Sequence, residues 1–254
     1  MKATVTSRTD IATSGTLILD GRDHDVNGNL ISPISGMPGI WTTGSVSQSG
    51  SSKIGGYVGS VDYPPTTGSS GTTTASGQPA GVAAATPDQA LGGTVGGYPE
   101  GTLKAIAISG IGGSQYATNP AAITVPLSGV TYVELPSGQV WQPLTIQGSG
   151  ILIVSNSSRD AQMKNLNVGT FRGLMIVDDL IHVHSDIIGG IIILTQHPSA
   201  GNCLGNGSGD IAYSTQAIKN ATAAAAQAGN ITIGAPQFNF GFGKTRLFIK
   251  YWYE

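Results

Sequence analysis

Short apolar runs, each introduced by a glycine, recur in the middle of the chain. The clearest three begin 23 and 17 residues apart, at 150–154, 173–177 and 190–194. Weaker runs between them alternate apolar and polar positions, at 144–146, 166–168 and 181–184. A continuous apolar run indicates a strand buried on both faces, and alternation indicates a strand with one face in solvent. A repeat of about 20 residues that supplies both kinds predicts a parallel β-solenoid.

The predicted fold class is therefore all-β, with a right-handed parallel β-helix as its architecture. Parallel strands stack at about 4.8 Å, so like side chains form ladders. Glycine is expected at the corners, where the backbone turns with positive φ. The alternative is a β-sandwich, whose hairpins would give antiparallel strands.

Helix signals appear twice. Ser214 and Thr215 can cap an Ala-rich helix over 215–228, and Gly229 can end it. A second, short helix is predicted after Pro99 and Glu100, which suit a first turn. A strand is the alternative for that second segment, because its isoleucines alternate. Further short strands are expected at 16–19, 40–43, 45–47, 129–134, 231–233 and 247–253.

The chain divides into three regions by composition. Residues 1–59 read as strands and turns, 60–97 as a low-complexity loop or linker, and 98–254 as the β-solenoid with its helix and C-terminal strands. Residues 68–85 are nearly all Gly, Ser, Thr, Ala and Pro, and such a segment buries little. The alternative for this segment is an ordered excursion packed on the scaffold.

Charge is scarce throughout. Only 10% of the 254 residues are charged, the net charge is −2, and 38 residues are glycine. A nucleic-acid binder needs a basic patch, which 12 dispersed Lys and Arg do not supply. Helical bundles and fully disordered chains have other compositions. The remaining class is a β-rich extracellular or cell-envelope protein. Its single cysteine, Cys203, excludes an intramolecular disulfide.

A calcium loop is the first candidate site. Asp23, Asp25, Asn27 and Asn29 place oxygen ligands at alternate positions, and Gly28 permits a sharp turn. Ile34 stands where an EF-hand requires glutamate, so any ion needs a distant carboxylate, with Asp10 and Asp20 as candidates. The alternative is an Asx-rich hairpin turn with Asn27 and Gly28 at its tip.

Two further groups of polar residues are candidates for a catalytic or metal-binding site. One is an Asp and His cluster, in which two His on one strand face could bind a transition metal or act as acid and base: Asp178, Asp179, His182, His184 and Asp186. The other would suit a glycan-cleaving solenoid with carboxylates on adjacent coils: Glu134, Arg159, Asp160, Asp178 and Asp186. The alternative for the His-bearing cluster is an ordinary polar strand that faces solvent.

The order of motifs from 148 to 226 carries a resemblance. Three glycine-introduced strands are followed by a Gly/Asn-rich turn at 205–209, a short strand at 210–214 and a helix start at 216–218. Upstream stand LDGRDHD at 19–25 and Asn27-Gly28. This arrangement resembles the β-helical region of PilX-like type IV pilus assembly proteins of bacteria. The resemblance implies a role in pilus or secretion-system assembly, an N-terminal membrane helix and no catalytic residues.

We therefore expect a non-enzymatic structural or adhesive protein of the cell envelope or surface. The sequence is expected to be a trimmed form, attached to a membrane only through the missing N-terminal helix. Its expected partners are other pilus or envelope proteins or further copies of itself, with no nucleic acid. The alternatives are a β-helix that binds or cleaves polysaccharide, for which the partner is a glycan, and a self-assembling filament subunit.

Overall fold

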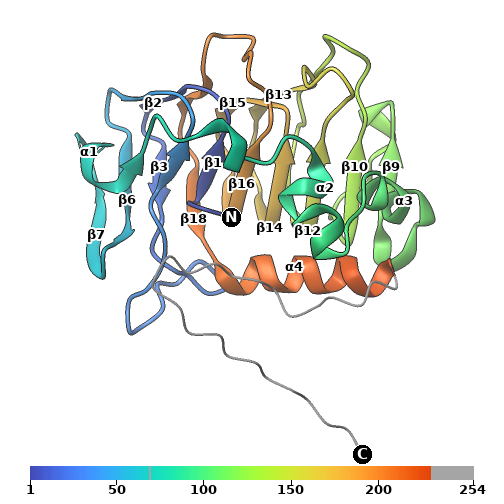
Figure 1. The fold of residues 1–254 in the computed structure, drawn as a ribbon, viewed down its shortest axis with the longest axis horizontal. Coiled ribbons are helices and arrows are strands. Elements are labelled where there is room, and N and C mark those ends of the chain that lie inside the picture. Colours follow the sequence, from blue (N-terminus) through green and yellow to red (C-terminus); the bar gives the residue numbers. More distant parts are fainter. Residues whose placement is uncertain (69, 230–254) are drawn as a thin grey trace, which may run out of the picture.

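The structure is a computed structural model that describes residues 1–68 and 70–229. Over these residues the chain is mostly β, with parallel sheets and a few short helices (Figure 1). Sheet A consists of β1 (Val5–Ser7), β3 (Ile18–Asp20), β4 (Ile40–Thr42), β6 (Lys53–Val58), β7 (Val61–Thr66), β8 (Thr74–Ala75), β9 (Gln115–Ala117), β10 (Val130–Val133), β12 (Gly148–Val154), β14 (Thr170–Val177), β16 (Asp186–Ile193) and β18 (Asp210–Tyr213). Sheet B consists of β2 (Ile11–Gly15), β5 (Val46–Gln48), β11 (Val140–Trp141), β13 (Gln162–Leu166), β15 (Asp179–Val183) and β17 (Cys203–Gly207).

The helices are short and lie outside the sheets. They are α1 (Ser70–Thr73), α2 (Pro87–Ala90), α3 (Thr102–Ser109) and α4 (Thr215–Ala228), with 3₁₀ turns at η1 (Ala80–Val82), η2 (Gly93–Gly96), η3 (Ile111–Gly113) and η4 (Pro120–Ala122). In the described part of the chain, none of them is long and apolar enough to cross a membrane.

From β10 to β18 the chain alternates between the two sheets. Sheet A has the order β7-β6-β3-β18-β16-β14-β12-β10-β9, and sheet B the order β11-β13-β15-β17-β2-β5. Between the named strands of the described residues, every pairing is parallel except that of β6 with β7. A β-sandwich built from hairpins would require mainly antiparallel pairs.

The two kinds of strand occupy different sheets. The continuous apolar runs form β12, β14 and β16, which lie side by side in sheet A, while the alternating strands β13 and β15 lie in sheet B. The segment 144–146 was predicted as a strand and is not one, because it forms a bend between sheets, where Leu144 is 85% exposed. Of the segment predicted as a strand at 166–168, only Leu166 lies in β13, and Val168 is 71% exposed. In β12, β14 and β16 the continuous apolar pattern and the burial agree.

Sheet A is covered on both faces, which explains its continuous apolar runs. Leu152, Met175 and Ile191 are opposite one another in register and pack in one core with residues of sheet B, such as Met163 and Leu180. The neighbouring side chains of the same strands point the other way and pack under α3 and α4: Ile151, Ile153, Leu174, Ile176 and Ile192. The outer face of sheet B carries half-buried polar side chains instead.

A column of glycines runs through the middle of sheet A. Gly150, Gly173 and Gly189 pair in register, with φ of 116°, 142° and 145°. A Cβ on Gly173 or Gly189 would lie well under 3.0 Å from the carbonyl oxygen of the glycine on the preceding strand, and a Cβ on Gly150 would lie as close to that of Gly129, just before β10. The expectation that these glycines mark corners was therefore wrong. They lie inside strands, where the lack of a Cβ allows the backbones of two neighbouring strands to approach each other. The third member is Gly189, one residue before the predicted start of its run.

The N-terminal strands lie beyond the last strands of the central region. β1, β2 and β3 pair with β16, β17 and β18 on one side and with β4, β5 and β6 on the other. Local sequence patterns predicted parts of β3, β4 and β5 but not β1, β2 or β6. The strands of residues 1–66 thus extend the same two sheets that the central strands form.

The predicted Ala-rich helix is confirmed as α4. Ser214 is its N-cap, with its Oγ accepting a hydrogen bond from the Ala217 N–H at 3.1 Å, and Gly229 is its C-cap. The helix packs across β12, β14 and β16, where Ala221 and Ala225 are buried (Figure 1). Small side chains let the helix lie close over the sheet.

The second predicted helix is confirmed as α3, although Pro99 and Glu100 precede it rather than form its first turn. Residues 60–97 contain β7, β8, α1, α2 and two 3₁₀ turns, so the alternative of an ordered excursion applies to their described part. The strands predicted at 231–233 and 247–253 lie outside the described residues.

Candidate functional site

The predicted calcium loop is part of an excursion from sheet A between β3 and β4. Isolated antiparallel bridges join Arg22 to Gly36 and His24 to Leu30. The excursion therefore has the form of a hairpin, with Gly28 in the left-handed region at φ 86° near its tip. This is the geometry of the turn that the sequence offered as an alternative to calcium.

Two of the predicted ligands engage in the turn itself. The Asp25 carboxylate accepts hydrogen bonds from the backbone N–H of Asn27 at 2.8 Å, from the N–H of Asn29 at 2.9 Å and from the Asn29 side-chain amide at 3.0 Å. The side-chain and backbone hydrogen bonds of Asn29 hold the pKa of Asp25 below its ordinary value. Asp25 is half-buried, so its carboxylate remains partly reachable from solvent.

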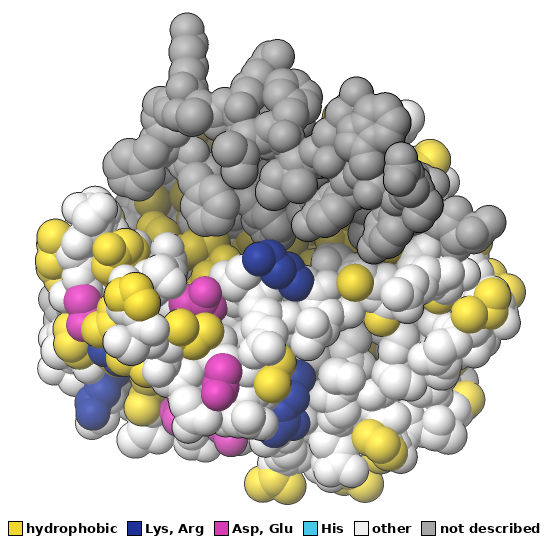
Figure 2. All heavy atoms as spheres, turned by 90° about the horizontal axis from the view of Figure 1, so that it is seen from below, with side chains coloured by type: hydrophobic (Ala, Val, Ile, Leu, Met, Phe, Trp, Pro, Cys, Tyr) yellow, Lys and Arg dark blue, Asp and Glu magenta, His cyan; other side chains and the backbone are white. Residues whose placement is uncertain are grey.

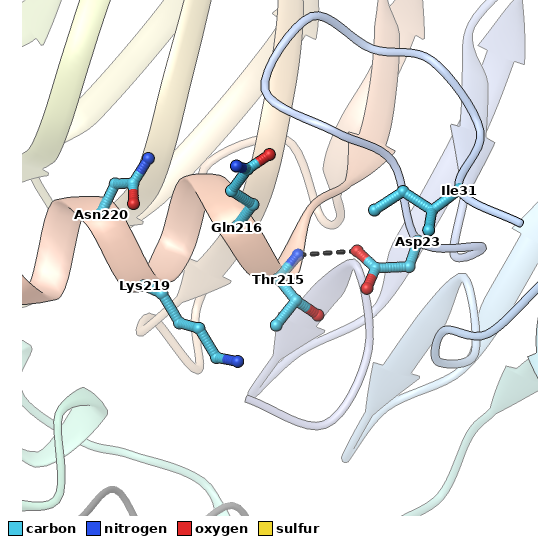
Figure 3. Close-up of a pocket in the computed structure, with 6 residues that line it drawn as sticks. All are labelled: Asp23, Ile31, Thr215, Gln216, Lys219 and Asn220. Atoms are coloured by element: carbon cyan, nitrogen blue, oxygen red, sulfur yellow. Dashed lines mark hydrogen bonds between the residues drawn. The ribbon is translucent and has the colours of Figure 1, made fainter.

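Asp23 is directed elsewhere, toward the start of α4. Its Oδ1 accepts a hydrogen bond from the Thr215 N–H at 2.8 Å, which places a carboxylate at the positive end of the helix. The pair, drawn in Figure 3, lines a depression of about 410 Å³ that is open to solvent. Its lining residues come from the hairpin and from α4: Asp23, Ile31, Thr215, Gln216, Lys219 and Asn220.

The two distant carboxylates also have partners. Asp20 receives two-pronged hydrogen bonds from Arg22, with Nε to Oδ1 at 2.9 Å and Nη2 to Oδ2 at 2.6 Å, and His24 Nε2 lies 3.6 Å from Oδ2. Asp10 accepts from the backbone N–H and hydroxyl of Ser45 at 2.6 and 2.9 Å. Each carboxylate thus forms hydrogen bonds with residues beside its own strand.

In the described part of the chain, no three His, Cys, Asp or Glu side chains gather in a way that could hold a metal ion. Calcium binding by Asp23, Asp25, Asn27 and Asn29 stays a prediction, since backbone carbonyls and water also bind calcium.

We expect the turn to hold without the ion. The thermal unfolding midpoint should change by less than about 2 °C when a chelator replaces excess calcium, because Asp25 is already satisfied by hydrogen bonds. Differential scanning calorimetry in both buffers measures this change. Asp25→Ala should then destabilise the protein equally in both buffers. A midpoint that rises with calcium in the natural chain, and not in the variant, would instead establish the ion site.

The Asp178 carboxylate joins two separate segments of the chain. Its Oδ1 accepts from the Ser155 hydroxyl at 2.8 Å, and its Oδ2 from the N–H groups of Asn156 and Ala161 at 2.8 and 3.4 Å. Arg159 Nη1 lies 3.7 Å from Oδ1. The side chain is fully buried, and burial raises the pKa of Asp178 to about 6. Asp178 therefore clamps the loop between β12 and β13.

The next residue, Asp179, clamps the following loop. Its Oδ2 accepts from the Ser199 N–H at 3.0 Å and hydroxyl at 2.6 Å, and its Oδ1 accepts from the Cys203 thiol at 3.1 Å. Burial raises the pKa of that thiol, so Cys203 stays protonated. These consecutive aspartates therefore hold one loop that precedes them in the chain and one that follows them.

Glu134 is at the equivalent position two strands before Asp178. Val133, Val154 and Val177 pair in register, so Glu134 and Asp178 follow β10 and β14, about 10 Å apart along the stack. The Glu134 Oε2 accepts from Lys104 Nζ at 2.6 Å and from the Tyr116 hydroxyl at 2.5 Å. Its side chain is 29% exposed.

Part of the predicted glycan-cleaving set is therefore brought together. Asp160 accepts from the Asn156 side-chain amide at 2.6 Å, next to the loop that Asp178 holds. Tyr132 also lies in this region, and burial raises its pKa to about 12. Asp186 lies at the start of β16, at the opposite end of the strand, where its Oδ1 accepts from the Asp210 N–H at 3.3 Å. Among the predicted carboxylates, only Asp186 is separated from the others.

The two histidines face outward from sheet B with separate partners. His182 Nδ1 lies 2.9 Å from Asn165 Oδ1, and His184 Nδ1 lies 3.0 Å from Ser208 Oγ. Burial and the charge of Lys164 lower the pKa of His182. Asp178 and Asp179 are buried, so this cluster does not act as one group.

Sequence reasoning missed Asp88. Its carboxylate accepts from the N–H groups of Gly101 and Leu103 at 3.0 and 2.9 Å and so caps α3. It follows Pro87 in a low-complexity region and lies 15 residues before Leu103, so no local capping pattern marks it. The ion pair of Arg22 with Asp62, at 3.5 Å, joins distant segments in the same way.

No protein-family model, no curated protein and no solved structure matches this chain.

Proposed function

We propose that this chain is a non-enzymatic structural or adhesive protein of the cell envelope, built on a right-handed parallel β-helix. Within that class, its resemblance to PilX-like proteins favours the soluble domain of a type IV pilus or secretion-system assembly component. The observation that carries the proposal is the continuous parallel register of strands, in which glycine keeps neighbouring backbones close.

The polar residues support this role. The carboxylate with the most perturbed environment, Asp178, is fully buried, and its oxygens are used to hold a loop. On the face that Figure 2 shows, uncharged atoms predominate outside the grey residues and charged side chains are few. A long rigid scaffold with such a surface suits contacts with other proteins of an assembly.

The gene can be deleted in the source organism to test this role. We expect most surface pili, or the corresponding secreted filaments, to be lost and to return when the intact gene is supplied. Electron microscopy counts the filaments, and an antibody to this chain locates it in the envelope. Unchanged filaments together with label confined to the cytoplasm would refute the proposal.

A second candidate function is polysaccharide binding or cleavage. It is favoured by the partial exposure of Glu134 near Lys104, Tyr116 and Tyr132, since a carboxylate beside aromatic and cationic groups suits a sugar. The carboxylate pair Glu134 and Asp178 would have to perform the chemistry.

We expect no release of reducing sugar from a panel of bacterial and plant polysaccharides, because Asp178 is enclosed. If sugar is released, Glu134→Gln should abolish it, while Asp186→Asn, at the other end of the strands, should leave it unchanged. Activity that depends on Glu134 in this way would replace the structural role with an enzymatic one. The triple change of His182, His184 and Asp186 to Ala tests the histidine cluster in the same assay.

A further inference from the structure

The order of strands in space differs from their order in the sequence. Residues 1–66 come first in the chain, yet their first strands pair with the last strands of the central region. Val5 pairs with Ile191 between β1 and β16, and Ile18 pairs with Asp210 between β3 and β18. The N-terminal segment therefore docks onto an edge formed by residues 186–213.

The docking site coincides with a break in the chain. Tyr213 pairs with Gly189, and Val5 pairs with Ile191. The register thus places Tyr213 and Thr4 at consecutive positions beside β16. At Tyr213 the chain leaves sheet A for α4, and at Thr4 the N-terminal segment takes its place. The edge is continued by a segment that reaches it from elsewhere in the chain.

The contacts at this edge require no covalent link between the two parts. The backbone N–H groups of Thr16 and Ile18 donate to the carbonyl oxygens of Gly207 and Gly209 at 2.9 and 3.1 Å. The apolar side chains on both sides belong to one core: Val5, Ile11, Leu19, Ile191, Cys203 and Ile211. An identical N-terminal segment from another molecule would make the same contacts.

The connection between the two parts lies at the surface of the molecule. It crosses sheet A from α1 to α2 in Figure 1. Residues 76–86 contain no buried side chain and are rich in Gly, Ala and Pro. Thr73 on one side, and Pro87 and Asp88 on the other, are buried. Gly77 and Gln78 donate backbone hydrogen bonds to the carbonyl oxygens of Gly44 and Thr42 at 2.8 and 3.0 Å, and Ala84 packs against the core under α3 and α4. Detachment of this stretch therefore breaks few contacts.

We propose that the edge formed by β16, β17 and β18 also accepts the N-terminal segment, from β1 through β8, of a second copy of this chain, so that copies join by exchanging these segments. The exchange replaces each contact by an identical one, and its cost is confined to the rearrangement of 76–86. The net charge of only −2 gives little repulsion between copies. The inference concerns this chain alone and holds whether or not the envelope role is correct.

A deletion of residues 76–85 tests the proposal. Ala75 pairs with Trp41 in sheet A, and α2 contacts β14, which lies four strand spacings from β8, or about 19 Å. After the deletion only Thr86 joins Ala75 to Pro87, and two peptide steps reach about 7 Å. One copy then cannot keep both ends in place. The matched control replaces 76–85 with ten Gly and Ser residues.

We expect the deletion variant to be dimeric or larger by light scattering after size exclusion, and the control to be mainly monomeric. If the deletion variant is a monomer, as the control is, the proposal is overturned. A second measurement uses the full-length chain and does not depend on how the deletion variant folds.

That measurement traps exchange with a disulfide. Ile11 and Cys203 pair in register between β2 and β17, and both side chains are buried in the same core. The variant Ile11→Cys with Cys203→Ser is refolded together with the natural chain and then oxidised. Exchange joins the thiol introduced at position 11 of one molecule to Cys203 of the other, because paired strands bring Cα atoms within disulfide range.

We expect a disulfide-linked dimer on a non-reducing gel that grows with protein concentration during refolding. The control mixture of Cys203→Ser with the natural chain should give none. The variant Ile11→Cys with Cys203 retained should close within one molecule and so verify the geometry. If that variant closes while the mixed pair gives no dimer at any concentration, the proposal is wrong.

Discussion

Replacing Gly173 with alanine is expected to lower the free energy of unfolding by about 4 kcal/mol, through backbone strain and overpacking together. Gly173 has φ 142°, and an added Cβ would meet the carbonyl oxygen of Gly150 on the preceding strand. Backbone atoms of a paired strand cannot move aside as a flexible side chain can. Relief of the contact therefore requires β12 and β14 to separate.

Chemical denaturation followed by circular dichroism measures this loss, which corresponds to a fall in melting midpoint of about 10 °C. Two control glycines separate its causes. Gly138 has φ 71° but open space around it, so Gly138→Ala reports the strain alone, about 1 kcal/mol. Gly81 has neither positive φ nor a close neighbour, so Gly81→Ala should be nearly neutral. Equal effects at Gly173 and Gly138 would show that close packing of the strands is not the cause.

The second large effect concerns pH and Asp178. Its pKa is raised from the ordinary value of 3.8 to about 6 in the folded protein. Between these values the folded state binds more protons than the unfolded state, so the stability contributed by this group falls as pH rises. The expected loss is about 3 kcal/mol between about pH 4 and pH 7, with little further change above.

Asp178→Asn removes this titration but keeps the side chain's shape. Its amide oxygen can accept from the Asn156 N–H, and its amide can donate to the Ser155 hydroxyl. Relative to the natural chain, the variant should therefore gain stability as pH rises through 6. Urea unfolding at a series of pH values measures the difference, in which groups common to both proteins cancel. A difference that is constant with pH would contradict the raised pKa.

Asp178→Ala should behave differently. It removes the same titration but leaves the N–H groups of Asn156 and Ala161 buried without their acceptor, so it should be about 2 to 3 kcal/mol less stable than Asp178→Asn at any pH. Asp186→Asn is the matched surface control, since Asp186 is exposed. It should change stability by less than about 0.5 kcal/mol over the same pH range.

The sequence could predict the kinds of strand, because burial on one or two faces leaves a local pattern. The runs that became β12, β14 and β16 were recognised in this way, and so was α4 from its cap and its alanines. The glycines were recognised as special, but their place was predicted wrongly. Positive φ suits both a corner and a close approach of backbones, and only the register of β12 with β14 distinguishes them.

The placement of residues 1–66 could not be predicted in the same way. β2 (Ile11–Gly15) contains Ala, Thr, Ser and Gly, and its burial depends on strands nearly 200 residues away. The site has the same limit. Asp178 and Asp179 were recognised as members of the Asp and His cluster. Only the neighbouring loops determine that Asp178 holds residues before it and that Asp179 holds residues after it. The Asp88 cap was missed for this reason.

The pairing of β1 with β16 also sets the timing of folding during synthesis. Ile191, the partner of Val5, leaves the ribosome 186 residues later, which at about 5 to 20 residues per second takes roughly 10 to 40 s. For that interval β1, β2 and β3 can pair only with β4, β5 and β6, because β16, β17 and β18 have not been made. The apolar residues that the N-terminal segment buries against the later strands therefore stay uncovered until those strands emerge.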